Sequence, residues 1–135
     1  MGSNETEPSI TADAADLLQR KGTIEILAEI GSEGPQRHTD LREELLLSSS
    51  TIQQRLKNGK ECGLWEQQLE DRSGVAAKVY ALTDLGKEVY EHAETEGLDT
   101  MYRIRRGLIR ELENAERRVI IDSSPSEADW LHDIE

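Results

Sequence analysis

Hydrogen-bonding side chains are concentrated in residues 48–60, where serine, glutamine and lysine alternate with a few apolar residues. Helical spacing places Ile52 and Leu56 on one side of this segment and the polar side chains on the other. A glutamine amide can bind adenine at two points, a serine hydroxyl can bind a base or a phosphate, and lysine can neutralise a phosphate. The segment is therefore suited to contact DNA. The outward residues are Ser49, Ser50, Gln53, Gln54 and Lys57.

Four more cations extend this set. Arg55 and Lys60 flank the polar side of the predicted helix, whose free N–H groups at its start suit a phosphate. Arg72 and Lys78 lie at the tip and on the return strand of a predicted hairpin, from which they can reach the DNA backbone or minor groove. The alternative is that these polar residues form an ordinary solvated helix face.

Other reactive residue types give weaker signals. Cys62 precedes Gly63 at an apolar helix exit, which is typical of a structural thiol, whereas a redox sensor needs an exposed thiolate of low pKa. His38, His92 and His132 have no metal-ligand spacing with one another or with Cys62. The sequence contains no glycine-rich phosphate loop and no nucleophile elbow. We therefore expect no enzyme, no metal site and no cofactor.

Apolar spacing and glycine breaks predict the helices that precede the polar segment. Gly22 interrupts the first apolar pattern, which predicts helices over 12–21 and 22–31. Gly31 and Gly34 should end the second of them. The apolar set consists of Ala15, Leu18, Ile26, Leu27 and Ile30.

The polar segment itself is predicted to be the second helix of a pair. Thr39 should open the first, which buries Leu41 and Leu45. Three serines then make a break, and one of them can cap a helix over 49–62 by accepting from its free N–H groups. Gly63 should end that helix.

Alternating residues on both sides of a turn signal predict a β-hairpin over 64–82. The turn is Asp71-Arg72-Ser73-Gly74, which has the residue types that β-turns favour. Thr83 or Asp84 should then cap a helix that runs to about Thr95.

A last, long helix is predicted over 98–119, after Gly97. Its apolar residues recur at spacings of three and four, close to the seam of a coiled coil. We therefore expect this helix to pair with that of a second copy. The seam consists of Met101, Ile104, Leu108, Leu112, Ala115 and Val119.

The chain is acidic, but its charge is unevenly spread. Its 135 residues carry 16 basic and 28 acidic side chains, for a net charge of -12. Residues 36–82 hold seven of each sign, so this part can approach a polyanion without strong net repulsion. Five lysines against 19 Glu and 9 Asp resemble the cytosolic proteins of halophilic archaea, although an acidic mesophilic protein has a similar balance.

The composition excludes several classes of protein. No apolar run approaches the roughly 18 residues of a membrane span. The first nine residues are polar and acidic, unlike a signal peptide. One cysteine excludes a disulfide framework. We expect a cytoplasmic protein with one globular domain.

Two motifs resemble those of winged helix-turn-helix regulators. The first is Ser48, Thr51-Ile52, Leu56 and Cys62-Gly63-Leu64, which is similar to the turn, the recognition helix and the exit into the wing. The second, Val79 to Gly86, is similar to the family's Tyr-x-Leu-Thr-x-x-Gly, which ends the wing. Gly59 departs from the pattern, since the family usually has an apolar side chain there. The resemblance covers residues 13–95 and fits the group with MarR, ArsR, Hxl-type and haloarchaeal phage repressor-like proteins.

The resemblance implies a mainly α fold with a small β-hairpin: a winged helix-turn-helix followed by a long C-terminal helix. The implied function is a homodimeric regulator of transcription, a repressor, that binds double-stranded DNA with residues 49–60 in the major groove and hairpin 64–82 as wing. The alternative is a winged-helix module that binds proteins and not DNA. The expected divisions are a disordered arm (1–11), the DNA-binding domain (12–95), the dimerisation helix (96–121) and an acidic tail (122–135).

Overall fold

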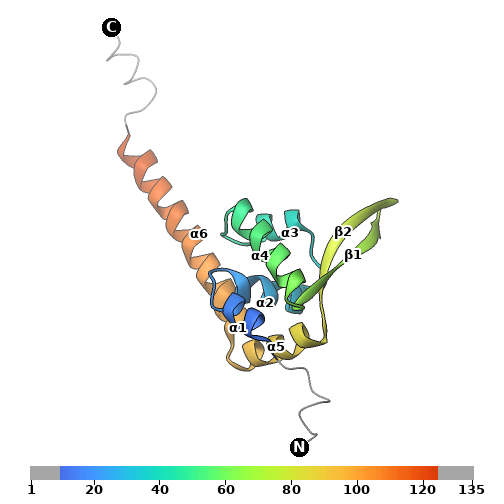
Figure 1. Cartoon of the computed structure of the whole chain (residues 1–135). Coiled ribbons are helices and arrows are strands. Elements are labelled where there is room, and N and C mark those ends of the chain that lie inside the picture. Colours follow the sequence, from blue (N-terminus) through green and yellow to red (C-terminus); the bar gives the residue numbers. More distant parts are fainter. Residues whose placement is uncertain (1–9, 125–135) are drawn as a thin grey trace, which may run out of the picture. The chain divides into compact units, whose positions relative to one another are not determined.

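The computed structural model describes residues 10–124, which form six helices and one antiparallel hairpin (Figure 1). The expected mainly α class with a small β-hairpin is confirmed. The chain divides into two compact units between Tyr102 and Arg103. The elements are α1 (Ala12–Leu18), α2 (Thr23–Glu33), α3 (His38–Glu44), α4 (Ser49–Glu61), β1 (Trp65–Arg72), β2 (Val75–Leu82), α5 (Asp84–Thr95) and α6 (Leu98–Ser123).

Helix α1 buries a different side from the one expected. Ala14 and Leu17 are buried, whereas Ala15 is exposed and Leu18 packs against the core only partly buried, so the predicted apolar set was wrong at Ala15. The Thr11 hydroxyl accepts from the Ala14 N–H and caps the start of the helix. Gly22 separates α1 from α2 with a φ of 90°, a conformation that glycine adopts at low cost.

Helix α2 continues past the position at which it was expected to stop. Gly31 lies inside the helix, and its missing side chain makes room for the ring of Tyr90 on α5. Gly34, with a φ of 90°, is the residue that ends α2. Gly31 therefore allows close packing of α5, and only Gly34 terminates the helix.

Helices α3 and α4 form the predicted pair. Helix α3 begins at His38, one residue before the expected Thr39, and buries Leu41. Leu45 follows its end and is also buried. Helix α4 packs against α1, α2, α3 and β1, so it lies across the core of this unit.

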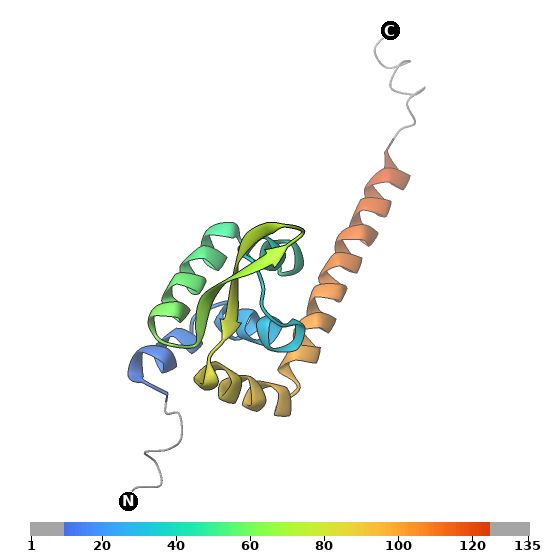
Figure 2. The same cartoon turned by 90° about the vertical axis from the view of Figure 1, so that its right-hand side faces the viewer.

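Strands β1 and β2 form the predicted hairpin, which extends beyond the helices of its unit (Figures 1 and 2). The register pairs Trp65 with Leu82 at the base and Arg72 with Val75 at the tip. Ser73 and Gly74 have φ values of 55° and 82°, and two positive values are what a type I′ turn requires.

The two motifs found in the sequence meet at the base of this hairpin. The Thr83 hydroxyl accepts from the Gly86 N–H and donates to the carbonyls of Gly63 and Leu64. A side chain at Gly86 would overlap the Leu64 carbonyl. Thr83 and Gly86 of the second motif therefore contact Gly63 and Leu64, with which the first motif ends.

Helix α6 is longer than predicted and ends at Ser123. Five of the six predicted seam residues, all except Ala115, are exposed large apolar side chains. Within the described residues, no helix is long and apolar enough to cross a membrane. Residues 1–9 of the expected arm and residues 125–135 of the expected tail lie outside the described range.

Candidate nucleic-acid interface

The start of α4 is fixed by its capping serine. The Ser48 Oγ accepts from the Thr51 N–H at 3.1 Å and lies 2.9 Å from the Thr51 hydroxyl. Ile52 and Leu56 are buried, as their spacing predicted. With this side packed inward, the register of α4 determines which polar side chains face solvent.

Most of the predicted DNA-contacting side chains of α4 share one exposed face. At 100° per residue these positions form one arc beside the buried stripe. Gln54 stands at one edge of the arc, in a hollow that it shares with Asp13 and Asp16 of α1. The exposed residues of the arc are Ser49, Ser50, Gln53, Gln54, Lys57 and Lys60.

Arg55 lies apart from this face. Helical spacing places it on the other flank of the buried stripe, and it is only partly exposed. Its Nε donates to the Lys21 carbonyl at 2.9 Å, in the connection between α1 and α2. This hydrogen bond ties α4 to the preceding helices and turns the guanidinium away from the arc.

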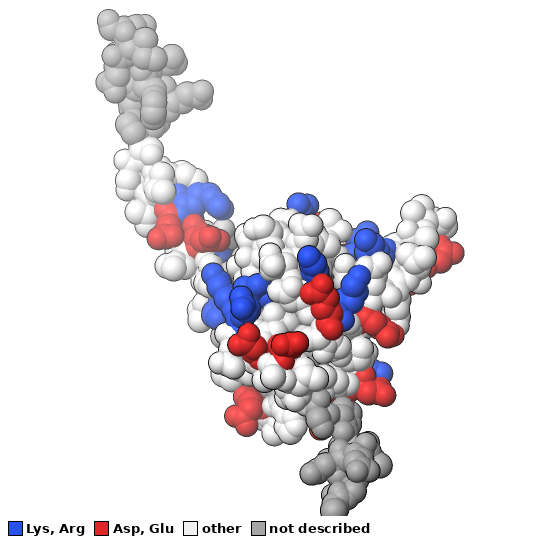
Figure 3. Space-filling view, viewed as in Figure 1, with Lys and Arg blue, Asp and Glu red and all other residues white. Residues whose placement is uncertain are grey.

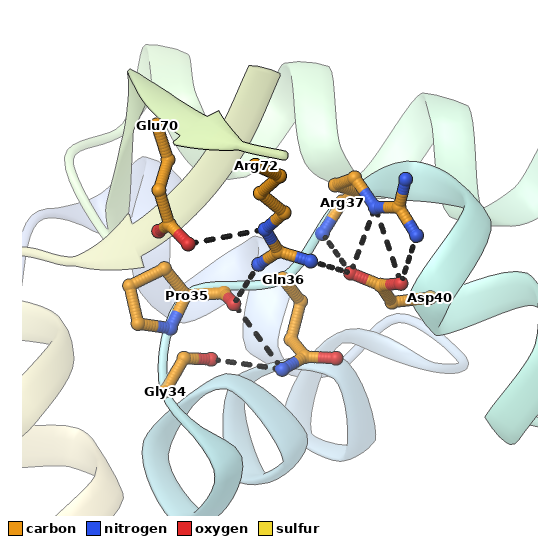
Figure 4. Close-up of polar contacts among 7 residues, drawn as sticks. All are labelled: Gly34, Pro35, Gln36, Arg37, Asp40, Glu70 and Arg72. Carbon is orange, nitrogen blue, oxygen red and sulfur yellow. Dashed lines mark hydrogen bonds and ion pairs between the residues drawn. The ribbon is translucent and has the colours of Figure 1, made fainter. Parts of the chain in front are cut away.

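Arg72 is held by carboxylates rather than standing out from the wing (Figure 4). Its Nη1 lies 3.3 Å from Asp40 Oδ2, and its Nε lies 3.0 Å from Glu70 Oε1. A further N–H points to the Pro35 carbonyl at 3.5 Å. The side chain therefore links the tip of the hairpin to the start of α3.

Asp40 is the centre of this link. Its carboxylate also accepts from the Nη2 of Arg37 at 2.8 Å and from the Arg37 backbone N–H at 2.9 Å; the second bond is the one that an N3 carboxylate makes to the N-cap backbone in a capping box. The hydrogen bond from Arg37 lowers the pKa of Asp40, with a smaller contribution from Arg72. In return, the pKa of Arg37 is raised. The sequence could have indicated this interaction, because Asp40 stands three residues after Arg37, the spacing at which an acidic side chain reaches the N-cap residue of a helix.

Lys78 is exposed on β2 and lies near part of the α4 arc. It lines one hollow together with Gln53 of α4 and with Arg37, His38 and Thr39. The last three were not predicted as interface residues, because their approach to β2 depends on how the hairpin folds back. His38 Nε2 lies 3.3 Å from the Ser49 carbonyl oxygen, which connects α3 to the first turn of α4.

Cys62 lies beside this interface without the properties of a reactive thiol. The side chain is partly buried, and its S–H points to the Gly59 carbonyl at 3.7 Å. Burial raises the pKa of the thiol, so the reactive thiolate is scarce at neutral pH.

Charge on this unit is mixed. On the face shown in Figure 3, lysine and arginine side chains alternate with acidic ones and form no continuous basic surface. A surface of mixed charge attracts a polyanion only weakly over long distances. Direct contacts must therefore supply more of any affinity for DNA.

The helix pair α3–α4, followed by the β1–β2 hairpin, defines a winged helix-turn-helix domain. Residues 17–101 match the HxlR-like helix-turn-helix family, and the chain belongs to that family. Its members are DNA-binding regulators of transcription and not enzymes.

The solved structures that resemble the chain include two regulators of transcription. The reduced form of the transcriptional regulator YodB from B. subtilis has a TM-score of 0.53 at 17% identity, over 67% of this chain and 90% of YodB. An ArsR-like transcriptional regulator from Rhodococcus sp. RHA1 has a TM-score of 0.49 at 25% identity, over 75% of this chain and 90% of its own. No curated protein sequence is significantly similar. The likeness to YodB supports the winged fold.

Proposed function

We propose that the chain is a homodimeric repressor in which each subunit inserts residues 49–60 into a major groove and uses hairpin 64–82 as its wing. The observation that carries the proposal is the exposed polar arc of α4 beside its buried stripe. An α-helix fits the major groove, where base edges present distinct hydrogen-bonding patterns. A dimer bound to a promoter would block access for transcription.

The residues of the arc divide into two roles. Gln53 and Gln54 are suited to read bases, because an amide can bind adenine at two points. Ser49 and Ser50 lie in the first turn, where a hydroxyl can reach a base or a phosphate. Lys57, Lys60 and Lys78 supply charge for the backbone. Arg55 and Arg72 have a positioning role instead: Arg55 ties α4 to the α1–α2 connection, and Arg72 ties the hairpin to α3.

The dimer would form through the seam of α6. Leu108 and Leu112 are 66% and 59% exposed, and burying large apolar side chains between two copies would be favourable. Met101 and Val119 are 18 residues and five seam steps apart, an average of 3.6 that keeps the seam on one face of a straight helix. Paired seams would fix the distance between the two copies of α4, and hence between the DNA half-sites.

The division of the chain belongs to the same proposal. Residues 12–95 form the DNA-binding domain, residues 96–121 the dimerisation helix, and residues 122–135 an acidic appendage. The acidic composition resembles that of proteins of halophilic archaea, whose carboxylates repel one another less at high salt. Phosphate contacts ordinarily weaken with salt, so uptake of cations at the interface would be needed to keep DNA bound.

The test is a footprint on the DNA upstream of the protein's own gene, at low and at near-molar KCl. A discrete palindromic footprint supports the proposal and gives the half-site spacing. Gln53→Ala combined with Lys57→Ala should abolish the footprint without unfolding the protein. Gln19→Ala, at an exposed position after α1, is the matched control.

The alternative of a protein-interaction module is favoured by the net charge of -12, which repels DNA at moderate salt. It predicts no footprint at either salt concentration from a folded protein. A reporter gene placed behind the footprinted site separates repression from activation.

A further inference from the structure

A groove of about 620 Å³ lies between the start of α3, helix α4 and strand β2. We call it the α3–β2 groove. It opens between the helix proposed to enter the major groove and the hairpin proposed as the wing. Its walls consist of Arg37, His38, Thr39, Gln53, Val75, Ala76, Ala77, Lys78 and Tyr80.

The charge of this groove differs from that of the rest of the unit. Three other hollows compared with it all contain carboxylates, from Asp84 in one, from Asp13 in the second and from Glu29 in the third. The α3–β2 groove has none in its walls, although the chain carries 28 acidic residues. It has instead Lys78, His38 and Arg37, of which Arg37 is paired with Asp40 outside the walls, so Lys78 and His38 are the groups suited to an anion.

The groove also has an apolar side. Val75 is 67% exposed and Ala76 is exposed, on a strand edge where charged residues usually protect against aggregation. Deoxyribose presents C–H groups beside its phosphates, so apolar side chains next to cations match a sugar–phosphate backbone. A free inorganic anion would use only the polar part of these walls.

His38 can respond to such an anion. The carbonyl of Ser49 can only accept a hydrogen bond, so the contact at 3.3 Å is a hydrogen bond in the tautomer with the proton on Nε2. In that tautomer Nδ1 carries no proton, and a proton added there would make it a second donor to a phosphate.

We propose that the α3–β2 groove binds the sugar–phosphate backbone of one DNA strand where it passes from α4 to the hairpin, and that protonated His38, Thr39 and Lys78 hold a phosphate there. The inference rests on the proposed function and goes beyond it by assigning residues of α3 and the apolar part of β2 to the interface.

The charge of the bound phosphate, rather than the neighbouring protein groups, sets the sign of the pH dependence at His38. Arg37, adjacent to it, is paired with Asp40. Lys78 and Tyr80 face the groove from β2, and the Ser49 carbonyl faces His38 from α4. A phosphate would add negative charge beside the ring and favour the protonated form. DNA binding should therefore take up a proton and become tighter as the pH falls.

The test measures the affinity of the full chain for a fluorescein-labelled duplex that carries the footprinted site, between about pH 8 and pH 6. The affinity of the wild type should rise about tenfold, because uptake of one proton changes the affinity by at most tenfold per pH unit and the uptake is partial over this range. His38→Gln keeps an amide donor for Ser49 and should remove most of this rise. The double variant His92→Gln, His132→Gln keeps only His38 and should retain it.

A second pair of variants tests the apolar side. Ala76→Asp places a carboxylate in the groove and should weaken binding at least tenfold. Gln68→Glu adds the same charge elsewhere on the hairpin, at an exposed position outside the groove, and should weaken binding by about threefold or less. Circular dichroism checks that both variants fold.

The outcomes separate the two proposals. If the wild type binds no DNA, the proposed function is wrong and this inference with it. If the wild type binds but His38→Gln keeps the full pH dependence, or the two charge variants weaken binding equally, the inference alone is overturned.

Discussion

The indole of Trp65 lies directly against the backbone of Gly59, and its Nε1 donates to the Leu56 carbonyl at 2.8 Å. A Cβ at position 59 would overlap the ring, which is buried at the base of the hairpin. Gly59 is the position at which the sequence departs from the resembling family. The departure is explained by the large aromatic residue that follows six positions later.

We expect Gly59→Ala to destabilise the protein, although alanine is intrinsically the better helix residue. A buried indole in a filled core has little room to move, and overpacking typically costs about 1–3 kcal/mol. Gly107→Ala is the control, because an added Cβ there meets nothing within 4 Å. It should raise stability by up to about 1 kcal/mol. Chemical denaturation measures both, and a stabilised Gly59→Ala would contradict the packing described.

We expect Arg72→Ala to loosen the hairpin tip. The guanidinium ion pair with Asp40 connects β1 to α3, and a second pair with Glu70 lies within β1. Removing both should speed amide exchange near the turn. The loss of stability should be no more than about 1 kcal/mol, since the pairs are partly exposed. Lys78→Ala removes the same charge from the same hairpin and should leave exchange unchanged. Equal exchange in the two variants would count against an anchoring role.

Acid should remove the contribution of Asp40 to stability. The hydrogen bond from Arg37 lowers its pKa in the folded state, so its stabilisation is full above the ordinary carboxyl pKa of about 4. It is lost as the pH falls through the lowered pKa of the folded protein. In Asp40→Asn the unfolding free energy should therefore fall less steeply in acid than in the wild type. Asp71→Asn, an exposed change of equal charge, should keep the wild-type slope.

We expect Leu112→Glu to convert a dimer to a monomer. It places a charge in the middle of the proposed seam, where burial without a partner is costly. Asn114→Glu adds the same charge to α6 away from the seam and should leave the dimer intact. Light scattering gives the mass in solution, against 15.2 kDa for one chain. A chain ending near Thr95 should also be monomeric, and a wild type of single-chain mass would refute the seam.

Local patterns were sufficient for much of the fold. Ser48 caps α4, Ile52 and Leu56 are buried, and residues 65–82 pair as a hairpin, as their spacing and turn residues predicted. These features depend on neighbours a few positions apart, whose propensities act within one turn or one strand pair. Errors arose where a distant residue intervened, as at Gly31, which contacts Tyr90.

The sequence by itself determined the class of this protein, a winged helix-turn-helix regulator. Three features were enough: two motifs in order, a neutral middle third within an acidic chain, and a polar helix face next to a buried one. Only the tertiary structure decided what each cation does, because Arg72 meets Asp40 across 32 positions and Arg55 meets Lys21 across 34. It also brought His38 and Lys78 to one groove. Such pairings depend on the fold of the hairpin over α3, and residue spacing along the chain carries no record of that approach.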